Sequence, residues 1–239
     1  VGTTTVRSRF DAATARGLTR FVGRDRELDE LRRALNRAAS GQGQVVAVSG
    51  EAGMGKSRLF WEFAHSGWTD GWLIVRCGSV SYYEATAYRH VIELLKSYFQ
   101  VDAHDDAPMT RDKVASKLLQ LDAQQLAPLV PAFLWLLDVA VADVEWERLD
   151  PPTRRQRALD GLRQLLLRHS LSQPLVIMFE NLHWVDAEAQ ALLNSLIDEL
   201  ADKRILLLVN YRPEYQHGWG DKACYRPLPI GALAQESSD

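Results

Sequence analysis

The hydrophobic residues of this chain are arranged in two alternating patterns. Short continuous apolar runs are typical of strands buried on both faces of a sheet, and apolar residues that recur every three or four positions are typical of one helix face. The predicted strands cover residues 44–49, 72–76, 175–179, 205–209 and a short segment near 228–230. One helix is predicted to begin at residue 25, and another to contain residues 91–99. Three more are predicted over residues 56–66, 151–171 and 187–200. This alternation predicts an α/β fold, a three-layer sandwich with a mostly parallel central sheet and ligands at the carboxyl ends of its strands.

A helical stretch without strands interrupts this alternation at about residues 101–150. We interpret 101–110 as an acidic, proline-containing loop, followed by two or three short helices up to residue 144. Pro128 and Pro131 would break these helices, because proline lacks the amide donor and its ring clashes with the preceding turn. We therefore expect a helical insertion within a core of residues 21–239, preceded by a linker or arm at 1–20 that has no clear periodicity.

One motif indicates specific chemistry. Residues 50–57, Gly-Glu-Ala-Gly-Met-Gly-Lys-Ser, match the phosphate-binding pattern G-x-x-x-x-G-K-[ST]. The loop follows a predicted strand and opens a predicted helix, so its amides and the helix N-terminus would face the same anion. The ammonium of Lys56 is expected to contact the β and γ phosphates of ATP, and the hydroxyl of Ser57 is expected to bind Mg²⁺. The alternative interpretation of the segment is a glycine-rich turn with an incidental lysine. The predicted nucleotide-binding residues of this segment are Gly50, Glu51, Ala52, Gly53, Met54, Gly55, Lys56, Ser57 and Arg58.

A carboxylate at the end of a neighbouring apolar strand would complete the site. The run 175–179 ends on Glu180, and an unpaired carboxylate is costly at the end of a buried strand. We predict that Glu180 contacts Mg²⁺ through water; the alternative is an exposed glutamate without a role. Asn181 is neutral and cannot accept a proton from water, and Asp186 is the remaining nearby carboxylate. Because the lack of a general base costs roughly 10²–10⁴ in rate, slow ATP hydrolysis is expected.

Composition excludes several other classes of function. The chain has 28 Lys and Arg against 31 Asp and Glu, so no overall positive field would attract nucleic acid or an anionic membrane. Its two cysteines are too few for a disulfide framework, and no apolar run approaches the roughly 18 residues of a membrane-spanning helix. We expect a cytoplasmic domain without a membrane partner and without direct nucleic-acid binding. Because the chain begins on Val1 rather than Met, we also expect it to be part of a longer protein.

Four segments resemble a known family. Residues 21–28 (FVGRDREL), the phosphate loop ending in Gly-Lys-Ser-Arg-Leu, residues 179–186 (FENLHWVD) and residues 210–214 (NYRPE) are similar to the STAND branch of AAA+-related ATPases. The resemblance is strongest to the ATPase domain that follows the cyclase domain in bacterial class III adenylate/guanylate cyclases, and residues 8–19 resemble the linker between those domains. ATPase domains of large helix-turn-helix regulators are also similar.

This resemblance implies roles for further residues. Val22, Gly23 and Arg24 would border the adenine and the phosphates, Glu180 would serve Mg²⁺, and Arg212 would be a polar sensor at the end of the fourth strand. The chain departs from the family where Asn181 replaces an acidic residue, which puts hydrolysis in doubt, and it lacks the helical lid and winged-helix region that normally follow the sheet.

The expected function is an ATP- and Mg²⁺-binding regulatory switch that slowly converts ATP to ADP and phosphate. Its expected catalytic residues are Glu180, Asp186 and Arg212, and its partner would be an attached cyclase or DNA-binding output domain. Self-association stays open. Asn181 favours the alternative, a nucleotide-binding or scaffold module without turnover. A phosphotransferase is disfavoured because the sequence has no lid signature, and a GTPase is disfavoured because it has no Asn-Lys-x-Asp motif. The pair at 183–184 (His-Trp) is either partner-sensing or a packed tryptophan with a hydrogen-bonded histidine.

Overall fold

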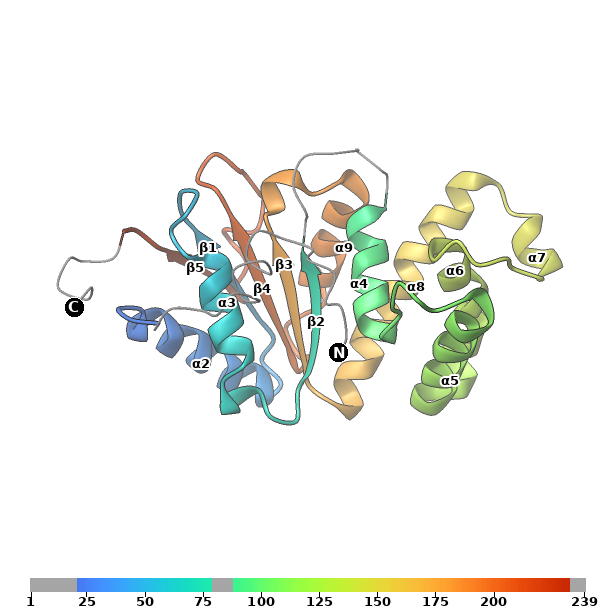
Figure 1. Ribbon diagram of the computed structural model, residues 1–239, viewed down its shortest axis with the longest axis horizontal. Coiled ribbons are helices and arrows are strands. Elements are labelled where there is room, and N and C mark those ends of the chain that lie inside the picture. The colour runs from blue at the N-terminus through green and yellow to red at the C-terminus, as the bar shows by residue number, and fades with distance from the viewer. Residues whose placement is uncertain (1–20, 79–87, 233–239) are drawn as a thin grey trace.

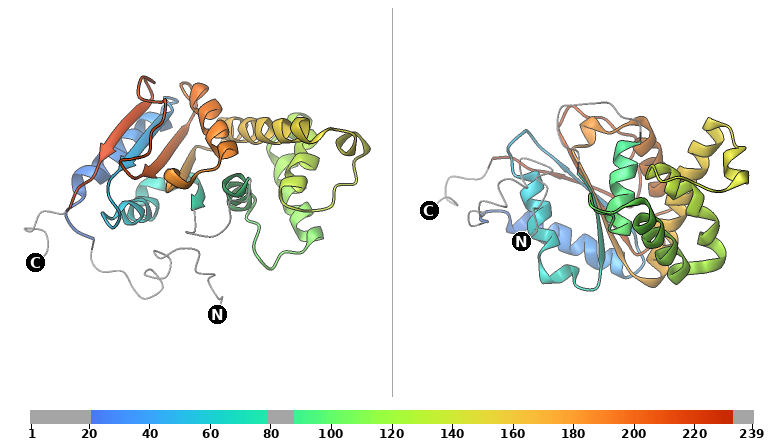
Figure 2. Two further views of the ribbon diagram at one scale, coloured as in Figure 1. Left: turned by 90° about the horizontal axis from the view of Figure 1, so that it is seen from above. Right: turned by 45° about the vertical axis from the view of Figure 1, so that its right-hand side comes forward.

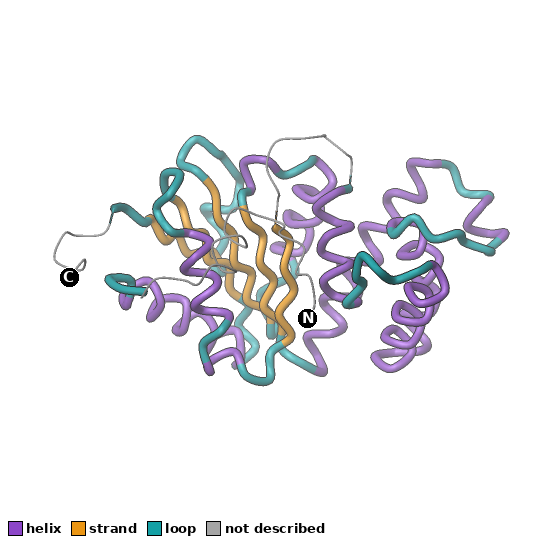
Figure 3. The backbone as a smooth tube through the Cα atoms, in the orientation of Figure 1, coloured by secondary structure: helices purple, strands orange, loops and turns teal. Residues whose placement is uncertain are grey.

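The described residues form a sheet of five strands, and every pair of neighbouring strands runs parallel. The computed structural model describes residues 21–78 and 88–232, so the predicted arm at 1–20 lies outside the described residues. In space the strands follow the order β2-β3-β4-β1-β5 (Figure 1; Figure 3). Their bounds are β1 Gln44–Ser49, β2 Leu73–Gly78, β3 Leu175–Glu180, β4 Ile205–Tyr211 and β5 Tyr225–Pro229. The predicted parallel α/β sheet is confirmed.

Helices cover both faces of this sheet. Helices α2 (Asp25–Ala39) and α3 (Lys56–Ala64) lie on one face, and α4 (Arg89–Phe99), α8 (Pro151–Ser172) and α9 (Ala187–Asp198) lie on the other (Figure 1). The insertion contains α5 (Ala107–Leu126), α6 (Val130–Leu136) and α7 (Val144–Glu147), and it lies beyond α4 and α8 from the sheet (Figure 2). Within residues 21–78 and 88–232 there are also three short 3₁₀ turns, η1 (Gly67–Thr69), η2 (Ala127–Leu129) and η3 (Leu182–Trp184).

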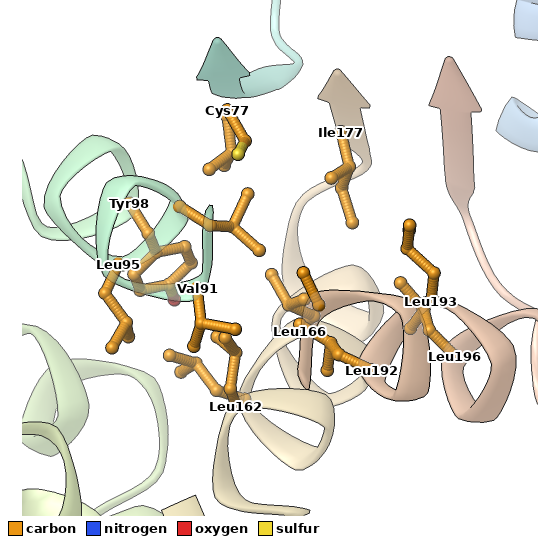
Figure 4. Packing of buried hydrophobic residues seen from close by; sticks show 14 of the residues in the cluster. Cys77, Val91, Leu95, Tyr98, Leu162, Leu166, Ile177, Leu192, Leu193 and Leu196 are labelled. Atoms are coloured by element: carbon orange, nitrogen blue, oxygen red, sulfur yellow. The ribbon is translucent and has the colours of Figure 1, made fainter. Parts of the chain in front are cut away.

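Two hydrophobic cores form because successive side chains of each strand point to opposite faces of the sheet. In β1, Val46 and Val48 belong to the core under α2 and α3, while Val45 and Ala47 belong to the core on the other face. In the latter core Ile177 of β3 faces leucines of α8 and α9 (Figure 4). Burial on both faces explains why the strands read as continuous apolar runs.

The first helix of the insertion begins earlier than the sequence indicates. The interpretation of residues 101–110 as a loop is wrong from Ala107 onward, because α5 starts there. Asp106 caps this helix by accepting a hydrogen bond of 2.8 Å from the amide of Met109. Pro108 lies in the first turn, where its missing amide donor has no intrahelical partner to lose. Acidic and proline residues that favour a loop therefore begin a helix here.

Strand β5 brings the end of the sheet against the phosphate-binding motif. It pairs only with β1 in the described sheet, and its Pro227 and Pro229 are tolerated because an edge strand needs fewer amide donors. The amide of Ile230 donates to the carbonyl oxygen of Ser49 at 2.8 Å, directly before the motif. Among the described residues, no helix combines the length and apolar character needed to cross a bilayer.

Candidate nucleotide-binding site

The predicted phosphate loop connects β1 to α3 and takes its shape from two glycines. Gly53 has φ of 83° and Gly55 has φ of 86°, in the left-handed region that residues with a Cβ rarely adopt. An added Cβ at either position would meet no heavy atom within 4 Å, so the backbone conformation and not crowding requires glycine. Gly55 is also the N-cap of α3, and the positive end of that helix therefore faces the loop.

Lys56 places its ammonium inside this loop. The side chain is buried, with 8% of the residue exposed, and its Nζ donates to the carbonyl oxygens of Gly50 at 2.5 Å and Glu51 at 2.8 Å. Burial lowers the pKa of Lys56 and the nearby Arg212 lowers it further, against the opposing carboxylates of Glu51 and Glu214. An ammonium held by two backbone carbonyls beside a helix N-terminus suits a polyphosphate, which is a stronger partner for a cation than a carbonyl oxygen.

The acidic strand end lies two strands away from the loop. We expected Glu180 on a strand neighbouring the loop strand, and this is wrong, because β4 lies between β1 and β3. At the usual strand spacing, the ends of β1 and β3 are then roughly 10 Å apart. Similar apolar runs do not encode the order in which strands pair.

Asn210, which sequence reasoning left without a role, connects the end of β4 to the end of β3. It is fully buried at the end of β4, and its Nδ2 donates to Oε2 of Glu180 at 3.4 Å. Its Oδ1 accepts a hydrogen bond of 2.8 Å from the amide of Asn181. Asn210 therefore holds both the carboxylate and the backbone that follows it. A polar residue near the end of an otherwise apolar strand was the signal that could have identified it.

Arg212 directly follows β4, at the position expected for a polar sensor. It follows Tyr211, which pairs with Ser49 directly before the phosphate loop, and its charge lowers the pKa of both Lys56 and His183. Its guanidinium lies 5.7 Å from the ring centre of Trp184, and its Nη1 lies 4.0 Å from Oε1 of Glu214. Its sensing role stays a prediction.

Asp186 is held in a structural position. One carboxylate oxygen accepts from the amide of Ala189 at 2.7 Å and so caps α9, and the other lies 2.9 Å from Nδ1 of His90. Burial would raise the pKa of Asp186, but the hydrogen bonds from His90 and Ala189 prevail and lower it. Since both oxygens are engaged, this geometry favours anchoring of α9, and the predicted catalytic role of Asp186 gains no support from it.

The segment before α2 contacts the phosphate loop through Arg24. The guanidinium of Arg24 is buried and donates to Oε1 of Glu27 at 2.7 Å, to the carbonyl of Met54 at 3.2 Å and to the carbonyl of Gly231. Arg24 therefore joins α2, the loop and the residues after β5. The predicted contacts of Val22 and Gly23 with adenine stay predictions.

His183 has no hydrogen bond within the described part of the chain. Both of its ring nitrogens are buried without a partner, and its ring centre lies 4.5 Å from that of Trp184. The interpretation of a hydrogen-bonded histidine beside a packed tryptophan is therefore wrong for the histidine, and it is also wrong for Trp184, which is 40% exposed. In residues 21–78 and 88–232 no group of three or more His, Cys, Asp or Glu could hold a metal ion, so Ser57 and Glu180 would bind Mg²⁺ only together with phosphate oxygens and water.

Comparison with known proteins matches most of this chain to one family. The AAA ATPase domain family matches residues 20–209. An uncharacterized protein of Rhizobium meliloti (strain 1021) is 26% identical over 222 residues, which are 91% of this chain and 21% of that protein. The chain thus spans about a fifth of this relative's length.

Solved structures are more distant. A chain in the structure of Drosophila ORC bound to DNA is 13% identical with a TM-score of 0.41, over 87% of this chain and 94% of that one. C. elegans PCH-2 is 9% identical with a TM-score of 0.36, over 88% of this chain and 43% of that one. Both TM-scores are too low to support an inference. Because the family match includes the phosphate loop, Glu180 and most of β4, the chain belongs to the AAA ATPase domain family.

Proposed function

We propose that this AAA ATPase domain is an ATP- and Mg²⁺-binding regulatory switch with slow ATP hydrolysis. The observation that carries the proposal is the buried ammonium of Lys56, held by the carbonyls of Gly50 and Glu51 inside a left-handed glycine loop. Lys56 and the loop amides would hold the phosphates, and Ser57 with Glu180 would hold Mg²⁺. Mg²⁺ bound with the phosphates would supply positive charge that offsets theirs.

Slow turnover follows from the carboxylates near the strand ends. Asn181 is neutral, and Asp186 uses both oxygens for His90 and Ala189. Glu180, which accepts a hydrogen bond from Asn210, is then the acidic group of β3 that could orient a water. A site without a positioned general base loses roughly 10²–10⁴ in rate. Asn181 also supports the alternative, a module that binds nucleotide and never hydrolyses it.

A regulatory role within a larger protein is supported by two observations. The Rhizobium relative is much longer than the segment that matches this chain, since that segment is 21% of the relative. The segments at 21–28, 179–186 and 210–214 resemble STAND ATPases, most of all those attached to bacterial class III cyclases. We therefore propose an attached cyclase or DNA-binding output domain, whose activity changes with the nucleotide bound here.

Thermal protection by nucleotides tests ATP binding. With Mg²⁺ and each nucleotide at a hundredfold the Kd of ATP, ATP stabilises the fold by about 2.7 kcal/mol, and GTP, which is expected to bind more weakly, stabilises it much less. Lys56→Ala removes this protection while the domain stays folded. Lys222→Ala is a matched control, because this lysine is exposed and pairs with Asp198 at 2.6 Å. Unchanged protection in Lys56→Ala would show that the loop is only structural, and equal protection by GTP would overturn the preference for adenine.

Single-turnover measurement separates the switch from the alternative. Radiolabelled ATP incubated with excess protein and Mg²⁺ is expected to form ADP slowly, and the Glu180→Gln variant should bind ATP while forming none. Absence of any ADP from the unmodified protein, together with intact ATP binding, would favour the module without turnover.

A further inference from the structure

The backbone around His183 is fixed by its neighbours. His183 lies in η3, which follows β3 after Asn181, a residue with a left-handed φ of 60°. The amide of Trp184 donates to the carbonyl of Asn181 at 2.9 Å, and the side chain of Leu182 is buried with 1% exposed. The turn therefore holds the imidazole in a defined place close to the end of β3.

The imidazole itself has unused hydrogen-bonding capacity. Both Nδ1 and Nε2 are buried and have no partner within the described part of the chain. A buried polar atom without a hydrogen bond destabilises the fold, so such atoms call for an explanation. His90 and Trp146 also have one such nitrogen each, but Nδ1 of His90 pairs with Asp186, and Trp146 lies in the insertion. Among the described residues, His183 is the imidazole for which both nitrogens are buried and unpaired.

The charges around His183 are those of the phosphate site. Burial is the largest cause that lowers the pKa of His183. The positive charges of Arg212 and Lys56 lower this pKa further, and the negative charge of Glu214 raises it. The ring packs on Trp184, and the guanidinium of Arg212 lies over the same tryptophan, 5.7 Å from its ring centre. A neutral imidazole has one N–H donor and one acceptor. His183 therefore has an N–H donor to offer where Lys56 and Arg212 provide positive charge.

We propose that His183 donates a hydrogen bond to the terminal phosphate of bound ATP and makes this site discriminate between ATP and ADP. The inference rests on the proposed function and deepens it. Lys56 reaches the phosphates from the loop that follows β1, and His183 reaches them from the turn after β3, which lies two strands from β1 in the sheet. A donor on that side contacts the third phosphate, which ADP lacks. The ring of Trp184 contacts both the imidazole of His183, in a tilted arrangement, and the guanidinium of Arg212.

Binding measurements on His183→Phe test the proposal, since phenylalanine keeps a flat ring and removes both nitrogens. Calorimetric titration with Mg²⁺ and the β,γ-imido analogue of ATP is expected to show roughly 10- to 100-fold weaker binding than for the unmodified protein, as for the loss of a hydrogen bond to a charged group. Binding of ADP is expected to be unchanged. His183→Asn and His183→Gln each supply a side-chain amide that can donate, and one of them should restore part of the preference for the triphosphate.

His65→Phe is the matched control, because this histidine is exposed at the end of α3 and its Nδ1 lies 2.8 Å from the carbonyl of Trp61. It should leave both affinities unchanged. If His183→Phe weakens the analogue and ADP equally, or weakens neither, the inference is overturned while the proposed function stands. If the unmodified protein binds neither nucleotide, the proposed function itself fails.

Thermal unfolding without nucleotide excludes a purely structural role. Replacing two unpaired buried nitrogens by carbon is expected to leave the melting temperature of His183→Phe unchanged or higher. A lower melting temperature, together with equal weakening of both nucleotides, would mean that His183 supports the fold and would overturn the inference.

Discussion

Two glycines offer a matched test of the phosphate loop. Gly53 lies in the loop with φ of 83°, and Gly41 lies between α2 and β1 with φ of 81°. At both positions an added Cβ would meet no heavy atom within 4 Å. The substitutions Gly53→Ala and Gly41→Ala therefore introduce the same backbone strain and no steric clash, and they differ only in location.

The effect on stability should be equal for the two variants. A left-handed conformation costs a residue with a Cβ about 1–2 kcal/mol. A stiffer unfolded chain offsets about 0.4–1 kcal/mol of this cost. A net loss of about 1 kcal/mol lowers the melting temperature by about 2–4 °C in a domain of this size. Scanning calorimetry without ligand measures both shifts.

The effect on nucleotide binding should differ. If Gly53→Ala turns one loop amide away from a charged phosphate, the loss of about 1.5–3 kcal/mol weakens ATP binding roughly 10- to 100-fold. Gly41→Ala should leave the affinity unchanged. Calorimetric titration with Mg-ATP measures both values. Equal affinities for the two variants would refute the assignment of residues 50–57 as the phosphate cradle.

Two further substitutions test how the site is supported. Asp186→Ala removes the α9 cap on Ala189 and the contact with His90, so about 1–2 kcal/mol of stability is lost at neutral pH. Because the pKa of Asp186 lies below its ordinary value of 3.8, its contribution is complete above that pH and is lost as the pH falls through the lowered pKa. Denaturant titrations should show the two proteins converging in strong acid, and a constant difference would contradict this. Gly50→Ala places a Cβ 2.6 Å from the carbonyl oxygen of Ile230, so it should destabilise the fold by about 1–3 kcal/mol, and an unchanged melting temperature would contradict the close approach of β5.

Features that depend on local chemistry were predictable from the sequence. The bounds of β1 agree with the predicted strand, and α3 begins at Lys56 as predicted. Glycine spacing, the apolar run before it and the lysine after it all act within a few residues of one another. The phosphate loop, the parallel sheet and the position of Arg212 after β4 could therefore be predicted without coordinates.

Features that depend on distant parts of the chain could not be predicted. Five similar apolar runs do not specify that β4 lies between β1 and β3, and this order determines which polar residues meet. Asp186 has His90 as a partner 96 residues away, so proximity in sequence to Glu180 suggested a catalytic role. Asn210 gains its function only because β3 and β4 pair in parallel and bring its amide to Glu180.

The most direct test of the central claim is a crystal structure with Mg²⁺ and the β,γ-imido analogue of ATP. The account predicts that the triphosphate lies within the loop of residues 50–57 and that the ammonium of Lys56 leaves the carbonyls of Gly50 and Glu51 for the phosphate oxygens. Lys56 still bound to those two carbonyls, with the triphosphate bound elsewhere on the domain, would contradict it.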